Sequence, residues 1–191
     1  MSRRKIWAAT LAVVGVYCTI QGGWIHAKAA LAQVLLERAW SETAGGRGPT
    51  RPWPWADTHP VGRLQVPAHG VDLVVLAGAT GRTLAFAPGH LSGSAEFGAP
   101  GNAVVAGHRD THFAFLKHLR TGQEIRIESV EGRVQTYRVI GWMVRNERDV
   151  TALDRWGPST LTLIKCFPFD TPIPGGPLRY VVEAEPVDVA L

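Results

Sequence analysis

One stretch decides how the chain is interpreted: Thr160-Leu-Thr-Leu-Ile-Lys-Cys-Phe-Pro-Phe169, which holds the only cysteine outside the N-terminal apolar segment. Leucines alternate with other residues along 161–166, and this period-two pattern is typical of a β-strand. Pro168 cannot donate a hydrogen bond to a sheet, so the strand must end near it. We therefore expect Cys166 at the C-terminal end of a strand, where a side chain can face a groove.

A thiol in that position is useful as a nucleophile only with two helpers. A base must take its proton or the surroundings must lower its pKa, and a cation or dipole must hold the oxyanion that develops during attack. The more common role of a lone cysteine is that of a small buried hydrophobe. The second cysteine, Cys18, lies in the N-terminal apolar segment, so we expect no disulfide between it and Cys166.

The base that we expect is His108, which ends the run Gly101-Asn-Ala-Val-Val-Ala-Gly-His108. It directly follows an apolar strand, as Cys166 does at its own strand end, and two such ends can share a groove if the strands are parallel neighbours. The cation that we expect is Arg179, at the start of the apolar run 178–185. A guanidinium offers several fixed donors to a carbonyl oxygen. Together the three residues predict one site.

The rest of the chain reads as a mainly β protein of 191 residues. Gly and Pro are plentiful, and Val, Ile and Thr occur in short runs. We expect about eight strands, enough for a closed small barrel filled by side chains. The net charge is +4, with no basic stripe carrying interleaved aromatic residues, so nucleic acid is not an expected partner. The strands are expected over residues 63–67, 71–77, 84–90, 102–107, 123–128, 134–144, 161–166 and 178–185.

The N-terminus has the pattern of a membrane anchor. A cationic cluster at residues 2–5 precedes an apolar segment over 6–25, about the 20 residues that a bilayer core requires. Trp7 and Trp24 lie near its two ends, where interfacial aromatic residues are found. We expect a single-pass transmembrane helix in contact with membrane lipid, with a cytoplasmic N-terminus and an exported body. A cleaved signal peptide is the alternative.

Three regions follow from these patterns. Residues 1–25 form the cytoplasmic tip and anchor, residues 26–51 a helix and a turn-rich linker, and residues 52–191 the β-barrel domain. A fragment that begins near Trp40 is expected to fold by itself.

A metal site is the competing interpretation of the same residues. Cys166, His108 and His112 are possible ligands, but no further cysteine or acidic residue repeats the spacing of a known metal motif. We therefore predict neither a metal nor another cofactor.

The three motifs together resemble those of the sortases, the membrane-anchored cysteine transpeptidases. Thr162-Leu-Ile-Lys-Cys166 resembles the family's Thr-Leu-x-Thr-Cys strand. Ala106-Gly-His108 is similar to its histidine motif and Leu178-Arg-Tyr-Val-Val182 to its arginine strand, in the same order. The run 101–113, with Pro52-Trp-Pro-Trp-Ala-Asp57 upstream, is most similar to the proteobacterial group called class GN or marine sortases.

This resemblance implies an eight-stranded sortase barrel that faces the periplasm from the inner membrane, in contact with inner-membrane lipid, and acts as a cysteine transpeptidase and peptidase. Cys166 would attack a peptide bond in an LPXTG-like signal near the C-terminus of a protein substrate and form a thioacyl enzyme. An amine acceptor, or water, would resolve that intermediate. His108 would be the general acid and base, and Arg179 would steady the oxyanion or anchor the substrate.

One departure from the family pattern concerns Lys165, which stands where the family usually carries threonine. Neighbouring strand residues face opposite ways, so we expect this side chain to point to solvent from the sheet face opposite Cys166. Two other functions stay open from the sequence. The first is a non-catalytic exported barrel that binds peptides, and the second is a different cysteine hydrolase with the same Cys–His pair.

Overall fold

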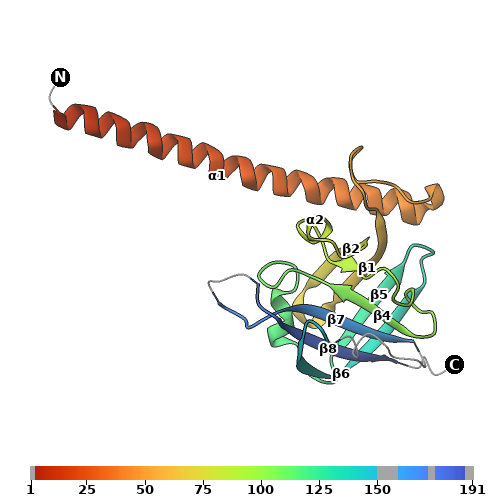
Figure 1. Ribbon diagram of the computed structural model, residues 1–191. Coiled ribbons are helices and arrows are strands. Elements are labelled where there is room, and N and C mark those ends of the chain that lie inside the picture. The colour runs from red at the N-terminus through yellow and green to blue at the C-terminus, as the bar shows by residue number, and fades with distance from the viewer. Residues whose placement is uncertain (1–2, 150–158, 172–174, 188–191) are drawn as a thin grey trace.

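The computed structural model describes residues 3–149, 159–171 and 175–187, except for the side chains of residues 5, 6, 8, 9 and 25. A long helix, α1, leads into a β-barrel at the C-terminal side (Figure 1). Short turns of 3-10 helix lie at Pro67–His69 and Ala114–His118, and a π-helical turn at Thr43–Arg47 follows α1. The regular elements are α1 (Arg3–Glu42), β1 (Pro60–Val66), β2 (Val71–Ala77), α2 (Gly81–Leu84), β3 (Gly89–His90), β4 (Asn102–Ala106), β5 (Glu124–Ser129), β6 (Val134–Asn146), β7 (Thr160–Phe167) and β8 (Leu178–Pro186).

The eight strands close into a barrel in the order β1-β2-β3-β4-β7-β8-β6-β5, and β5 pairs with β1 to complete the ring. Two neighbouring pairs are parallel, β2 with β3 and β4 with β7, while the others are antiparallel. Closure removes the open sheet edges that would otherwise expose unpaired backbone groups. The predicted mainly β, closed, eight-stranded barrel is confirmed.

The barrel interior is filled by inward-facing side chains, which alternate with outward-facing ones along a strand. In β1 every second residue is buried, with Leu64 and Val66 fully so. Each such side chain stabilises the fold by about 1.5–3 kcal/mol relative to an exposed one. The largest fully buried apolar and aromatic side chains of this core are Leu64, Phe113, Leu116, Ile125, Ile127, Tyr137, Leu161 and Leu163.

The strand β7 is covered on both of its faces, because its threonines are buried as well as its leucines. The hydroxyls of Thr160 and Thr162 donate to Oδ1 of Asn102 on β4, at 3.2 and 2.9 Å. Burial of a hydroxyl is costly without a hydrogen-bond partner, and Asn102 provides one for each. These contacts reinforce the parallel pairing of β4 with β7.

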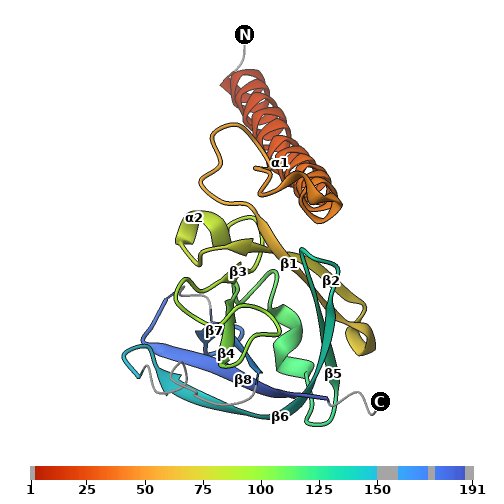
Figure 2. The same cartoon turned by 90° about the vertical axis from the view of Figure 1, so that its right-hand side faces the viewer.

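The C-terminal part of α1 packs against the barrel. Leu36 and Trp40 belong to a second buried cluster with Val74 and Leu76 of β2. The carboxylate of Glu37 accepts a hydrogen bond from Arg63, and the two charged groups are 2.8 Å apart. In both views α1 runs past the β1–β2 side of the barrel, and its N-terminal half extends beyond it (Figure 2).

The N-terminal half of α1 contains the segment over which a transmembrane helix is expected from the sequence. Its large apolar side chains, among them Leu11 and Tyr17, are exposed. Within the described residues, no helix has both the length and the apolar character needed to cross a membrane. Polar and small residues, such as the run Gln21-Gly-Gly23, dilute the apolar segment. The structure therefore does not support the transmembrane helix expected over residues 6–25.

Candidate active site

Three neighbouring strands carry the three predicted site residues. The parallel pair β4–β7 sets Ala106 opposite Ile164, and the amide of Gly107 donates to the carbonyl of Ile164 at 3.0 Å. In the antiparallel pair β7–β8, Cys166 lies directly opposite Arg179. Residues 166 and 179 are thus in register, and His108 follows Ala106 by two residues, as Cys166 follows Ile164.

Cys166 and Arg179 line a common groove of about 340 Å³. Directly opposite residues of an antiparallel pair project from the same face of the sheet, which explains why the two side chains meet there. Gly107 closes the groove at the end of β4. His108 itself is exposed and is not among the lining residues, so the structure brings two of the three predicted side chains into the groove and places the third beside it.

The groove has an apolar floor and a charged rim. The rim carries Arg145, Glu147 and Asp149 from the end of β6 and the residues after it. The apolar floor residues are Leu84, Leu91, Val104, Ile164 and Val181. A site of this kind suits a peptide segment with apolar side chains and a polarised carbonyl near the thiol.

The thiol of Cys166 and the guanidinium of Arg179 differ in their contacts with other groups. Cys166 is half-buried, Cys18 on α1 is exposed, and neither forms a disulfide. Arg179 donates to Glu147 at 2.6 Å and to the carbonyls of Gly176 and Leu178 at 2.7 and 3.0 Å. A guanidinium has five N–H donors, so these contacts still leave donors for a substrate oxygen.

A comparison with family models finds a match to the sortase domain over residues 64–187. The chain belongs to the sortase family. The matched range begins in β1 and ends just after β8, so it covers the barrel from its first strand to its last.

Individual sortases agree with this result. The curated Sortase D of Bacillus subtilis is 26% identical over 122 residues, which are 63% of this chain and 61% of that protein. This sortase therefore matches less than two thirds of the length of that relative. A sortase C-1 from Actinomyces oris is 30% identical, with a TM-score of 0.59 and coverage of 67% of this chain and 74% of that one. The Sortase D5 transpeptidase of Clostridium perfringens shares the fold, with a TM-score of 0.67, 21% identity and coverage of 83% and 99%.

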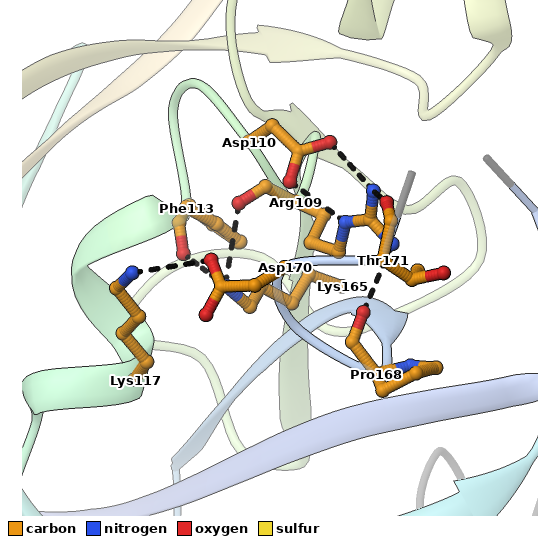
Figure 3. A network of polar contacts seen from close by, with 8 residues as sticks. All are labelled: Arg109, Asp110, Phe113, Lys117, Lys165, Pro168, Asp170 and Thr171. Carbon is orange, nitrogen blue, oxygen red and sulfur yellow. Dashed lines mark hydrogen bonds and ion pairs between the residues drawn. The ribbon is translucent and has the colours of Figure 1, made fainter. Parts of the chain in front are cut away.

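Lys165 differs from the sequence-based prediction in this sortase. Its side chain is only 2% exposed, so the expectation that it points to solvent is wrong. It does face away from Cys166, but that face is covered by the segment 109–113. Nζ donates to the carbonyl of Phe113 at 2.8 Å and to that of Arg109 at 3.3 Å (Figure 3). Burial lowers the pKa of the Lys165 ammonium to about 8.

Arg109 is a second buried cation that the sequence interpretation missed. Its side chain is bound by both oxygens of Asp110, at 2.7 and 2.8 Å. The same guanidinium donates to the carbonyls of Pro168 and Thr171, each at 2.9 Å (Figure 3). Its hydrogen bonds hold the pKa of the Asp110 carboxyl below its usual range. The signal in the sequence was the position of Arg109 and Asp110 directly after His108.

The structure gives no support to the metal alternative. Burial, together with the nearby charge of His108, lowers the pKa of His112. Across residues 3–149, 159–171 and 175–187, no group of three or more His, Cys, Asp or Glu side chains lies close enough to hold a metal ion.

Proposed function

We propose that this sortase is a cysteine transpeptidase that cleaves an LPXTG-like signal near the C-terminus of a protein substrate. The observation that carries the proposal is the register of β4, β7 and β8, which sets Cys166 opposite Arg179 in one groove beside the segment that bears His108. The family match supports the same class of reaction. The acyl acceptor is an amine, or water where no amine is bound.

The proposed reaction assigns one task to each group. The Cys166 thiol transfers its proton to His108, the resulting thiolate sulfur forms a bond to the scissile carbonyl carbon, and the carbonyl oxygen becomes an oxyanion that Arg179 stabilises. His108 donates a proton to the leaving amine as the peptide C–N bond breaks, which leaves a thioacyl enzyme. The incoming amine then attacks the thioacyl carbon while His108 takes its proton, and the thiolate leaves.

We also propose the finer placement that the motifs favour. The runs 101–113 and 52–57 support membership of the class GN or marine group. The cationic cluster at residues 2–5 supports an inner-membrane location with the barrel on the extracytoplasmic side. Protease added to intact spheroplasts should then digest the barrel, whereas digestion only after lysis would contradict this location.

The function is tested by cleavage of a library of LPXTG-like peptides. The wild-type protein should release the C-terminal fragment of at least one member, and Cys166→Ala should abolish that release. Cys18→Ala is the matched control, because it removes the other thiol from an exposed position on α1, and it should leave cleavage unchanged.

The other outcomes identify the rival functions. Unchanged cleavage by Cys166→Ala would contradict the proposed nucleophile. A thiol probe that labels Cys166 while no library member is cleaved would favour a different cysteine hydrolase. Failure of both labelling and cleavage would favour a non-catalytic peptide-binding barrel.

A further inference from the structure

The candidate site is assembled from two segments that are far apart in the sequence. The first, residues 107–113, follows β4 and carries His108. The second, residues 168–171, directly follows β7, two residues after Cys166. Each segment lies in a connection between strands, so the pairing of β4 with β7 does not by itself fix the position of either.

A cation from β7 holds the first segment. The amide of Phe113 donates to the carbonyl of His108 at 3.1 Å, which closes residues 108–113 into a turn. The ammonium of Lys165 donates to two carbonyls of this turn, those of Arg109 and Phe113. Its Nζ also lies 3.9 Å from the centre of the Phe169 ring, a favourable cation–π position. The threonine that Lys165 replaces has too short a side chain to span this distance.

A cation from the first segment holds the second in return. Arg109 is 7% exposed and donates to the carbonyls of Pro168 and Thr171, on either side of Asp170. Asp110 binds the same guanidinium on its other edge and fixes its orientation. Lys165 thus reaches from β7 to the first segment, and Arg109 reaches from the first segment to the second. Both donate to main-chain carbonyls (Figure 3).

Given the transpeptidase function proposed above, we propose that Lys165 and Arg109 are positioning residues that form a reciprocal brace and hold His108 in place beside Cys166. Neither side chain takes part in bond making. The brace is needed because His108 is exposed and, among the described residues, its imidazole makes no hydrogen bond that would fix it. Proton transfer requires hydrogen-bond reach, and a displacement of about 1 Å can cost on the order of 100-fold in rate.

The buried ammonium of Lys165 is not expected to stabilise the fold more than an apolar side chain would. An ammonium buried among main-chain groups carries a desolvation cost, which an apolar side chain of similar length would avoid. Lys165→Met is therefore expected to fold, while it loses both hydrogen bonds to the turn. Lys117→Met is the matched control, because it removes an exposed ammonium from the neighbouring 3-10 turn, where its ion pair is with the side chain of Asp170 at 3.5 Å and not with a carbonyl of the turn.

Hydrogen exchange tests the brace without reference to catalysis. Under native conditions, Lys165→Met should exchange the amide of Phe113 at least about tenfold faster than the wild type, and Lys117→Met should not. Arg109→Lys is the second variant, since an ammonium cannot reach the two carbonyls and Asp110 together, and it should accelerate the same amide. Unchanged exchange in both variants would overturn the brace, whether or not any sorting peptide is cleaved.

Kinetics tests the positioning role. For a cleaved peptide, Lys165→Met should lower kcat on the order of 100-fold with KM little changed, and Lys117→Met should retain the wild-type kcat. Because both cations belong to one device, the double variant with Arg109→Lys should lose little more than Lys165→Met alone. A lower melting temperature with an unchanged kcat would overturn the proposal. If the wild type cleaves no peptide while exchange responds as expected, the proposed function fails and the brace stands.

Discussion

Arg179 lies directly opposite Cys166 in the β7–β8 pair, and Glu147 and two carbonyls occupy part of the donors of its guanidinium. The remaining N–H groups are available to a developing oxyanion. Arg145 lies directly opposite Arg179 on β6, lines the same groove and pairs with Asp149 at 3.2 Å. The groove is therefore lined by two arginines, of which Arg179 belongs to the strand that pairs with β7.

Arg179→Ala should consequently lower kcat/KM by about 100- to 1000-fold, the usual loss when one oxyanion donor is removed. Arg145→Ala is the matched control and should lose less than about tenfold, because Arg145 lies on β6, one strand farther from Cys166 than Arg179, and its charge is paired with Asp149. Steady-state cleavage of one sorting peptide by both variants measures the difference. Equal losses would mean that Arg179 contributes charge to the groove and not a donor to the reacting carbonyl.

Lys165 should make the stability of the protein depend on alkaline pH. In the folded protein its pKa is about 8, whereas its ordinary value is 10.5. Burial is the main cause; the positive charges of Lys117 and Arg109 lower this pKa further, whereas the carboxylates of Asp110 and Asp170 oppose the shift. Between these two values the unfolded chain binds more protons, so rising pH favours the folded state.

The free energy of unfolding of the wild type, compared with that of Lys165→Met, should therefore increase by about 1–3 kcal/mol as the pH rises through this interval. Urea unfolding of both proteins at a series of pH values measures this difference. A difference that stays constant, or that falls with pH, would contradict the buried ammonium.

At this scale the sequence predicted the positions of the candidate residues at strand ends better than it predicted their surroundings. Cys166 and Arg179 share the expected groove, and each could be placed because it adjoins a recognisable apolar strand. Strand alternation also placed Lys165 on the face opposite Cys166. It could not show that this face is covered, because the cover comes from residues 109–113, which are distant in the sequence.

Among the elements, the junction after β4 is the most tightly packed part of the site. A methyl group at Gly107 would come within 2.6 Å of the ring of Phe113, which is fully buried and cannot yield. The glycine is thus required by close packing between the end of β4 and the turn that carries His108.

Gly107→Ala should therefore destabilise the protein by about 1–3 kcal/mol through overpacking. Gly141→Ala in β6 is the matched control, since a methyl group there would meet no atom within 4 Å, and its stability should be close to that of the wild type. Thermal unfolding of the two variants provides the comparison. If both melted together, the packing between Gly107 and Phe113 would not constrain the turn.

The sequence predicted the bounds of the longer strands more closely than those of the shortest strand, β3. The predicted bounds of β2 are those observed, and β7 and β8 differ from their predictions only at their ends. The irregular run 84–90 is resolved into the end of α2 and the two-residue strand β3. β3 exists because β2 and β4 pair with it on either side, and such long-range pairing leaves no local pattern.

At the scale of the whole molecule, one part of α1 packs against the barrel and the rest of the helix is exposed. Leu36 is 1% exposed against β2, whereas Leu31 on the same helix is 58% exposed. A fragment that begins near Trp40, which the sequence predicts to fold, would lose Leu36 and the ion pair of Glu37 with Arg63. The sequence pattern identified the helix, but amphipathic spacing does not show where its packing begins.

Leu36→Ala should lower the free energy of unfolding by about 2–4 kcal/mol, because it leaves a cavity between α1 and β2. Leu31→Ala is the same substitution at an exposed position and should change it by less than about 0.5 kcal/mol. Denaturant unfolding of both variants tests this. Equal stability of the two would show that α1 is not held against the barrel in solution.

The central claim is that β4, β7 and β8 form one acyl-transfer site around Cys166. The most direct measurement is the intact mass and peptide map of the protein quenched in acid during turnover of a sorting peptide. The account predicts a thioacyl adduct of the N-terminal peptide fragment on Cys166, absent from Cys166→Ala. Peptide cleavage with the adduct on another residue, or with an undiminished rate in Cys166→Ala, would contradict it.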